Sequence, residues 1–254
     1  MNIKILSYNI HKGFDWRNKN YFLKEMKEFI GSTKADIVFL QEVLGKNNKL
    51  KEQGFIDSQF EFLADELWPH FSYAKNAIYD HGHHGNLILS KFPIESYENI
   101  DLSTNSLEKR GLLLCKIRLP DNHFFYAACS HLNLLHNSRL LQYEKIKKTL
   151  QAKFHFEEDH HFPIILAGDF NDWNKQCENI FEGELEMIEA HKFIHGRYAK
   201  TFPAIMPFLC LDRIYLKNFT IKKSLTLAPT TEKSLFTHLS DHLPIFCEVE
   251  LNGK

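Results

Sequence analysis

Acidic and amide side chains stand repeatedly at the ends of apolar, strand-like runs in this sequence. Side chains two positions apart share a strand face, so the face of Ile3 and Ile5 leads to Asn9, and the face of Ile165 leads to Asp169. A polar residue where a single strand ends at the surface is ordinary. Such surface ends, however, usually consist of Lys, Ser and Gly and not of so many short acids. The set that stands out is Asn9, Glu42 (after Val38 and Leu40), Asp169, Asn171, Asp212 and, in a loop before the last strand, Asp241 and His242.

Carboxylates that converge in this way need a compensating positive charge. Mutual repulsion and desolvation disfavour several carboxylates in one place unless they share a cation or a proton. Oxygen ligands from acids and one Asn amide suit Mg²⁺ or Mn²⁺ and not zinc. If these side chains meet in the fold, the sequence predicts a magnesium or manganese site.

The elements that must position these residues are mostly strands. Two sheets packed face to face, with helices outside, fit many strands and few, irregularly placed helices. No repeat, low-complexity tract or linker interrupts the chain, so we expect a single domain over residues 1–254. Strands rich in β-branched and aromatic residues are predicted at 3–10, 36–43, 86–92, 111–119, 124–132, 163–170, 211–216 and 244–251. Helical spacing of apolar residues predicts helices at 20–31, 56–68 and 138–154.

Composition excludes several classes of protein. The 254 residues include 31 Lys plus Arg and 32 Asp plus Glu, which gives a net charge of −1. This balance argues against disorder and against a protein that holds nucleic acid mainly by bulk charge. The sequence shows no signal-peptide core and no run of about 18 apolar residues. We therefore expect a soluble cytoplasmic protein without a transmembrane segment, and we predict no obligate protein partner.

The five cysteines are widely spaced, odd in number and form no CxxC pair. Cys115, Cys129 and Cys247 lie within apolar runs, where a buried free thiol is the simplest interpretation. We therefore predict that the protein has no disulfide and no zinc cluster, and that it works in a reducing compartment.

Seven sequence blocks carry a resemblance to a known family. In order they are SYNIHKG, DIVFLQEV, HGNLILSKFPI, CSHLN, AGDFND, LDRIYL and SDHLPI. They resemble the signature blocks of the endonuclease/exonuclease/phosphatase superfamily, the DNase I-like fold, and most closely its small bacterial members. One block alone is weak evidence, whereas the ordered set from Asn9 to His242 is strong. The resemblance implies an α/β fold, a four-layer αββα sandwich of two mainly antiparallel sheets flanked by helices, and metal-dependent hydrolysis of phosphoester bonds, usually with Mg²⁺.

The resemblance also implies roles for the metal and the attacking water. Asn9 and Glu42 match positions that bind the metal, and Asp241 is a further metal contact. The metal would polarise the scissile phosphate and neutralise charge on the leaving oxygen. Asp169 and Asn171 match the pair that positions and deprotonates the attacking water.

Two histidines complete the implied catalytic set. Asp212 and His242 match the family's Asp–His pair, in which the carboxylate orients the imidazole; whether the imidazole acts as base or as a phosphate-stabilising cation stays open. His131 matches a position that is His in DNases, sphingomyelinases and inositol-phosphate phosphatases, but Tyr in the abasic-site repair branch. Protonated, it would donate to a phosphate oxygen or the leaving group. Asn133 and Arg139 are weaker candidates to face the phosphate.

Two classes of function compete. One is a metal-dependent phosphodiesterase, nuclease or phosphatase, and the other a non-catalytic binding member of the same fold. The enzyme is favoured because every matched catalytic position holds a competent residue. Nucleic acid, a phospholipid headgroup and an inositol phosphate remain open as substrates. A nuclease would be helped by a basic groove and stacking aromatics, and a lipid-directed enzyme by apolar loops beside the cleft. Neutral charge and one apolar loop, residues 201–211, lean slightly away from a dedicated DNA enzyme.

Overall fold

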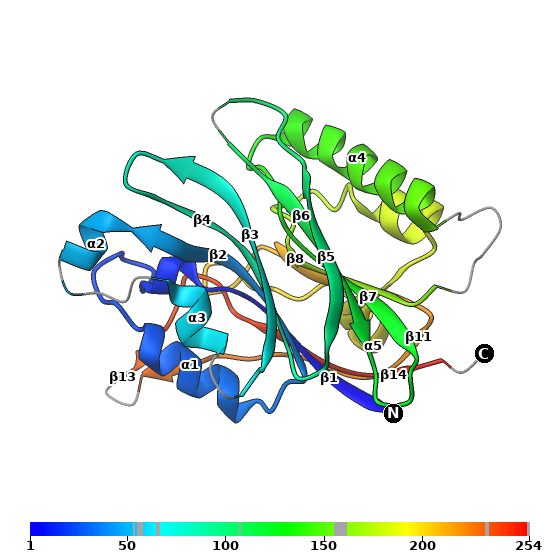
Figure 1. Ribbon diagram of the computed structural model, residues 1–254, viewed down its shortest axis with the longest axis horizontal. Helices are drawn as coiled ribbons and strands as arrows, with labels where there is room; N and C mark the ends of the chain where they lie inside the picture. Colours follow the sequence, from blue (N-terminus) through cyan, green and yellow to red (C-terminus); the bar gives the residue numbers. More distant parts are fainter. Residues whose placement is uncertain are drawn as a thin grey trace.

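Two six-stranded sheets form the centre of the molecule (Figure 1). The computed structural model describes residues 1–52, 54, 58–64, 67–106, 108–154, 162–231 and 234–252. The first sheet has the order β11 (Phe219–Thr226), β14 (Ile245–Leu251), β1 (Asn2–Asn9), β2 (Ile37–Asn47), β4 (Gly82–Ser90) and β3 (His70–Tyr79). The second has the order β5 (Ile94–Asp101), β6 (Gly111–Arg118), β7 (Phe124–His131), β8 (Ile164–Asp169), β10 (Asp212–Lys217) and β9 (Ile188–Glu189).

Each sheet contains one parallel pair among antiparallel neighbours. The parallel pairs are β1 with β2 and β7 with β8. A short hairpin of β12 (Thr230–Thr231) and β13 (Ser234–His238) stands apart from both sheets. The helical elements are η1 (His11–Gly13), α1 (Leu23–Ser32), α2 (Asn48–Glu52), α3 (Gln59–Ala64), α4 (His136–Phe154), the π-helical turn η2 (Asn179–Glu184) and α5 (Ala190–His195).

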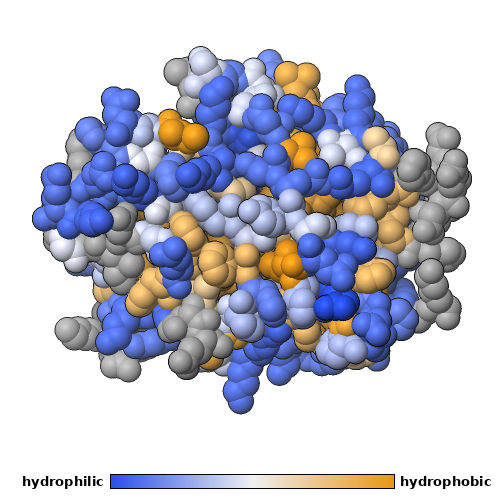
Figure 2. All heavy atoms as spheres, in the orientation of Figure 1, coloured by the Kyte–Doolittle hydropathy of each residue, from blue (hydrophilic) through white to orange (hydrophobic). Residues whose placement is uncertain are grey.

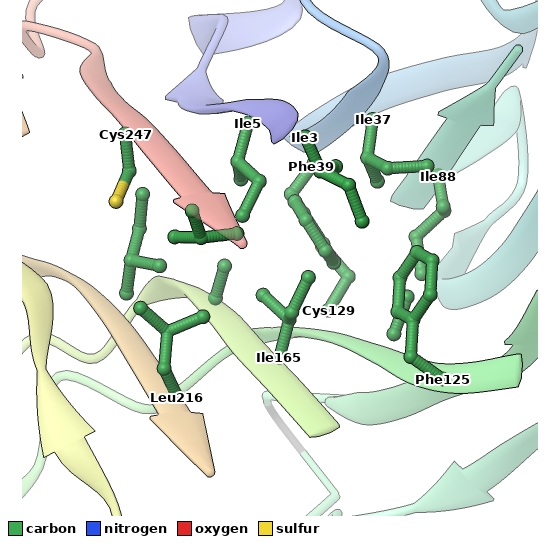
Figure 3. Close-up of a cluster of buried hydrophobic side chains, with 14 of the residues drawn as sticks. Ile3, Ile5, Ile37, Phe39, Ile88, Phe125, Cys129, Ile165, Leu216 and Cys247 are labelled. Carbon is green, nitrogen blue, oxygen red and sulfur yellow. The ribbon is translucent and has the colours of Figure 1, made fainter. Parts of the chain in front are cut away.

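The main core lies between the two sheets. Strand residues of alternate positions meet there, including Ile3, Ile5, Phe39, Ile165 and Leu216 (Figure 3). A second cluster covers the outer face of the second sheet with α4 and η2, and a third covers the outer face of the first sheet with α1 and α3. Helices therefore lie outside both sheets (Figure 1), which confirms the predicted four-layer sandwich.

All eight predicted strands and the three predicted helices correspond to elements of the structure. The helix expected over 56–68 is α3, and residues 56–57 and 65–66 of that prediction lie outside the described residues. Strands β3, β5 and β11 and the short strands β9, β12 and β13 were not predicted. β5 shows why: it is an edge strand with mostly exposed side chains, and its sequence IESYENID lacks a continuous apolar face.

The polarity of one face of the surface and the state of the cysteines bear on the sequence predictions. The face in Figure 2 is covered mainly by hydrophilic residues, with apolar residues in small separate groups. All five cysteines are free thiols, and Cys115, Cys129, Cys177 and Cys247 are buried. None of the helices within the described ranges has the length and apolar character needed to cross a membrane.

Candidate active site

Strand register brings three of the candidate side chains into one row of the second sheet. Asp169 ends β8 and pairs with His131 at the end of β7 and with Asp212 at the start of β10. The apolar residues next to them on the same faces, such as Ala167 before Asp169 and Ile214 after Asp212, belong to the core between the sheets. All three polar side chains are therefore aimed at the end of that core, as the strand alternation predicted for Asp169 and Asp212.

Asn9 links this row to the first sheet. It ends β1 and is almost fully buried. Its Nδ2 donates to Asp169 Oδ2 over 3.0 Å, and its Oδ1 accepts the backbone N–H of His11 over 3.0 Å. The amide oxygen is thus occupied by the His11 backbone, and the amide nitrogen bridges the two sheets.

Glu42 reaches the site by a route that strand alternation did not predict. Val38 and Leu40 pack toward the helices outside the first sheet, so simple alternation would turn Glu42 away from the site. A bulge between Leu40 and Val43, with φ +57° at Glu42, inserts an extra residue and turns the side chain inward. Glu42 Oε1 then lies 3.4 Å from Asn9 Nδ2. The expected shared face with Val38 and Leu40 is wrong, although the residue does join the site.

Lys12 is a site residue that the sequence analysis did not single out. Its Nζ donates to Glu42 Oε2 over 2.6 Å. The side chain arrives there because His11 and Lys12 both adopt left-handed backbone angles in η1, a conformation uncommon for residues other than glycine. The only sequence signal was a lysine three positions after the polar end of a strand.

The charges around Glu42 keep it ionised. Burial raises its pKa, but His131 in its protonated form and the ammonium of Lys12 outweigh that effect and hold the pKa of Glu42 well below its usual range. Its side chain is 17% exposed, so one edge of the carboxylate stays open to solvent.

Asp169 has the opposite electrostatic environment. Burial is the largest influence and raises its pKa to about 6; His242 opposes this and Asp212 adds to it. Oδ1 accepts the backbone N–H of Asn171 over 2.9 Å. The carboxylate can sit this deep because Gly168 lets β8 approach β7: a Cβ there would lie 1.9 Å from the Ser130 carbonyl oxygen.

Asp212 and His242 form the predicted pair. His242 Nδ1 lies 2.9 Å from Asp212 Oδ2, and His242 Nε2 lies 3.6 Å from Asp169 Oδ2. Burial lowers the pKa of His242, but Asp212 and Asp169 raise it to about 10. At neutral pH the ring is therefore an imidazolium between two carboxylates. The ring of Phe202 covers it, with centroids 5.0 Å apart.

His131 differs from His242 although both lie near Asp169. Its Nε2 is 3.5 Å from Asp169 Oδ2. Burial and the charge of Arg110 lower its pKa well below the usual value, despite the opposing effect of Glu42. His131 is therefore neutral at physiological pH and has one N–H to donate.

The remaining candidates divide between the site and its supports. Asn171 donates through Nδ2 to the Leu132 carbonyl over 2.9 Å, and Asp241 Oδ1 lies 3.6 Å from His11 Nδ1. Asn133 and Arg139 do not face the site's open edge. Both are fully buried; Asn133 bonds to Gln142, and Arg139 bonds to the carbonyl oxygens at 133 and 134.

The open oxygen donors suit a hard divalent cation. Glu42 and Asp241 are 17% and 24% exposed, whereas Asp169 and Asp212 are buried against His242. Carboxylate oxygens are the ligands that Mg²⁺ and Mn²⁺ prefer. Ligand atoms of Asp169, Asp212 and His242 also lie within 4.8 Å of one another, but a protonated imidazole has no lone pair for a metal. The residues present therefore fit a cation on the Glu42 side.

Comparison with known proteins concerns the family and the fold of the chain. The model of the "Endonuclease/Exonuclease/phosphatase family" matches residues 6–242. The chain is 40% identical over 252 residues to the uncharacterized protein YbhP of Escherichia coli (strain K12), covering 98% of this chain and 96% of that protein. Two solved structures share the fold: the mannosyl-6-phosphatase Bt3783 of Bacteroides thetaiotaomicron (TM-score 0.74, 18% identity, 98% and 100% coverage) and D. rerio TDP2 complexed with single-strand DNA product (TM-score 0.70, 19% identity, 98% and 99% coverage).

Proposed function

Because the chain belongs to the endonuclease/exonuclease/phosphatase family, which is made of phosphoester-hydrolysing enzymes, we propose that it is a phosphoesterase that uses a divalent metal, Mg²⁺ or Mn²⁺, and an activated water. The observation that carries the proposal is the position of Asp169, whose Oδ2 lies within 3.6 Å of donors from Asn9, His131 and His242. These donors come from both sheets and surround one buried carboxylate.

Asp169 is the general base in this proposal. A base acts best when its pKa lies near the working pH, and the pKa of Asp169 is raised to about 6. The Asn171 backbone N–H holds Oδ1, so that Oδ2 is the oxygen that takes the proton from water. The Asn9 amide fixes the orientation of that oxygen.

His242 and His131 bind the phosphate in different protonation states. Asp212 holds Nδ1 of His242 and leaves the charged Nε2–H edge toward Asp169, where it stabilises negative charge on a phosphate oxygen. This favours the cation over the base as the role of His242. His131 donates as a neutral imidazole toward a phosphate oxygen or the leaving group.

Glu42, with Asp241 as a further contact, would hold the cation; both carboxylates lie near His11. Bound there, a divalent cation supplies positive charge to the scissile phosphate and to the leaving oxygen. Asn9 serves this site by orienting the Glu42 carboxylate through Nδ2.

Phosphate release and bond cleavage across DNA, RNA, inositol phosphates, phospholipids and a soluble aryl phosphodiester test the proposal. We expect Mg²⁺- or Mn²⁺-dependent turnover of at least one substrate, lost in excess chelator and restored by metal. Asp169→Asn should abolish it, whereas the exposed Asp121→Asn, the same chemical change outside the site, should not. Turnover that persists in excess chelator, or that survives Asp169→Asn, overturns the mechanism. The absence of any metal-dependent turnover would favour the non-catalytic binding protein.

A further inference from the structure

Exposed apolar side chains are concentrated in a few segments of this protein. Eight of the 18 large hydrophobic residues exposed in the described part of the chain lie in residues 134–141, at Trp173 and in residues 205–208. Met206 is 71% exposed and Leu135 is 63% exposed. Single exposed apolar residues need no explanation, but a contiguous group marks an interaction site.

The three segments continue directly from the candidate site. Leu134 follows His131 by three positions, and Trp173 follows Asn171 by two, which limits each separation to about 10 Å because a residue spans at most about 3.6 Å of chain. The third segment belongs to the loop whose Phe202 ring lies on His242. The apolar residues therefore lie around the site and not at a remote position.

Two buried arginines hold the segments against one another. Arg139 donates to the Leu134 carbonyl, and its guanidinium lies 4.3 Å from the centre of the Trp173 ring. Arg213 donates to the carbonyl oxygens of Cys210 and Asp172, over 2.6 and 3.3 Å. Arg139 thus joins Trp173 to the first segment, and Arg213 joins Asp172, the neighbour of Trp173, to Cys210, which lies two residues after the third segment. The three segments together are here called the rim surface.

The charge of the rim surface differs from that of the whole chain. The protein has 32 acidic residues, yet residues 132–143 and 196–211 contain none, and the one acid in residues 170–177, Asp172, is fully buried. Exposed cations do occur there, at Lys175, Arg197 and Lys200. Glu144 and Glu178 flank these segments with side chains 43% and 41% exposed, and they are paired with Lys147 and Lys192. A surface that combines large apolar side chains with exposed cations, and whose flanking carboxylates are paired with lysines, fits a partner that is both apolar and anionic.

We propose that the rim surface docks on a bilayer that contains anionic phospholipids, and that it presents a headgroup phosphoester to the site. The substrate part of this inference rests on the proposed function. Apolar side chains insert below the headgroups while neighbouring cations attract anionic lipids, and Trp favours the interface. Single-stranded nucleic acid fits less well, because six of the eight exposed apolar residues are Leu, Ile or Met, and only Trp173 and Phe208 offer a ring on which a base can stack.

Vesicle binding tests the surface without any need for turnover. The purified protein is mixed with vesicles of phosphatidylcholine alone or with phosphatidylglycerol, in chelator, and bound protein is measured by co-sedimentation. We expect binding to the anionic vesicles that weakens as salt is raised. In a Trp16→Phe background, Trp173 emission should shift to the blue on binding, since Trp68 is buried throughout.

Two pairs of substitutions separate the rim surface from general stickiness. Leu134→Ser with Leu135→Ser, and Met206→Ser with Phe208→Ser, should each lower vesicle affinity at least about 10-fold, because each buried apolar side chain contributes roughly 1.5–3 kcal/mol. Tyr97→Ser with Phe124→Ser is the matched control. Both residues are exposed, and Phe124 begins β7, seven residues and roughly 23 Å from His131.

Each result decides the inference. No binding of the native protein to anionic vesicles, equal binding to neutral ones, or an equal loss in the control pair overturns it. Binding of an oligonucleotide that the rim variants weaken as strongly as vesicle binding would favour nucleic acid instead. Hydrolysis of a soluble aryl phosphodiester is measured in parallel. If that hydrolysis occurs without vesicle binding, the proposed function stands and membrane docking by the rim surface is wrong. If vesicles bind and no ester is hydrolysed, membrane docking stands and the proposed function is wrong.

Discussion

The bulge within β2 and the end of β8 each place one carboxylate at the site, but the surroundings shift the pKa values of the two acids in opposite directions. Glu42 has a lysine on one oxygen and stays charged, whereas Asp169 is buried near Asp212 and has its pKa raised to about 6. Pairs of acids with separated pKa values divide the tasks of an active site. One is a permanent anion suited to a cation, and the other exchanges a proton near neutral pH.

The difference comes from backbone position more than from residue type. Asp169 stays in strand register, between two strands of one sheet, where solvent is excluded. Glu42 leaves the register at a bulge and reaches the partly open edge of the site, where Lys12 meets it. Two similar side chains thus acquire different chemistry because one lies at a bulge within its strand and the other at a regular strand end.

Neutralising each acid in turn should have the largest effects and should distinguish their roles. Asp169→Asn removes the base and should lower kcat/KM by up to about 10⁴-fold at any Mg²⁺ concentration. Glu42→Gln should also be severely slowed, but raised Mg²⁺ should recover part of its activity because the loss lies in metal binding. Initial rates over a Mg²⁺ titration measure both. If raised Mg²⁺ restores the activity of Asp169→Asn and not that of Glu42→Gln, then Asp169 is the metal ligand and Glu42 the base, the reverse of our assignment.

The Asp212–His242 pair should follow, with losses of about 10²–10³-fold. His242→Ala removes the imidazolium, and Asp212→Asn removes the charge that supports it. Because both changes disable one unit, the double variant should be little worse than either single variant. kcat/KM and thermal melting of the three variants measure the coupling.

Losses that simply multiply, or near-native turnover in either single variant, would contradict a coupled pair. If all three variants fail to fold, the pair is structural and His242 leaves the catalytic set.

Much of the site was predictable because it depends on strand alternation. Asn9 and Asp169 follow apolar residues on their own faces, Asp212 precedes them on its face, and those faces do point into the core between the sheets. The hydrophobic pattern along a strand is local, so a sequence displays it directly.

The parts that sequence reasoning missed depend on backbone angles or on partners far along the chain. A bulge at Glu42 and left-handed angles at Lys12 leave no mark in the hydrophobic pattern. Arg139 and Asn133 were considered as phosphate contacts, and the structure shows hydrogen bonds from them to the loop carbonyls and to Gln142, which the sequence did not indicate. Such contacts follow from packing and not from residue type.

Stability should also separate the two acids, with opposite signs. In excess chelator at pH 7, Asp169→Asn should be more stable than the native protein by up to about 3 kcal/mol, because a pKa raised from 3.8 to about 6 means that the fold disfavours the charged form. This advantage should shrink as pH falls from 6 to 4, where the native protein protonates Asp169.

Glu42→Gln should instead be less stable than the native protein at pH 7, because the fold lowers the pKa of Glu42. The stability that Glu42 contributes is lost as the pH falls below the ordinary pKa of a glutamate. Urea unfolding across this pH range measures both, and equal signs would contradict the contrast.

The smallest effect is expected from the ion pair that sets Glu42 apart. Lys12 holds one oxygen of the carboxylate that we propose for the metal, so a cation must compete with its ammonium. Lys12→Met should tighten Mg²⁺ binding by up to about 5-fold, since a partly exposed ion pair is worth about 0–1 kcal/mol. Lys91→Met is a close control. Lys91 pairs with Asp36 over 3.0 Å, the exposure of this pair is similar to that of Lys12 and Glu42, and Asp36 lies just before the start of β2. Calorimetric titration of both variants with Mg²⁺ measures the change. Weaker binding in Lys12→Met would mean that Lys12 holds Glu42 in place for the metal and does not compete with it, whereas an equal change in Lys91→Met would remove the site-specific explanation altogether.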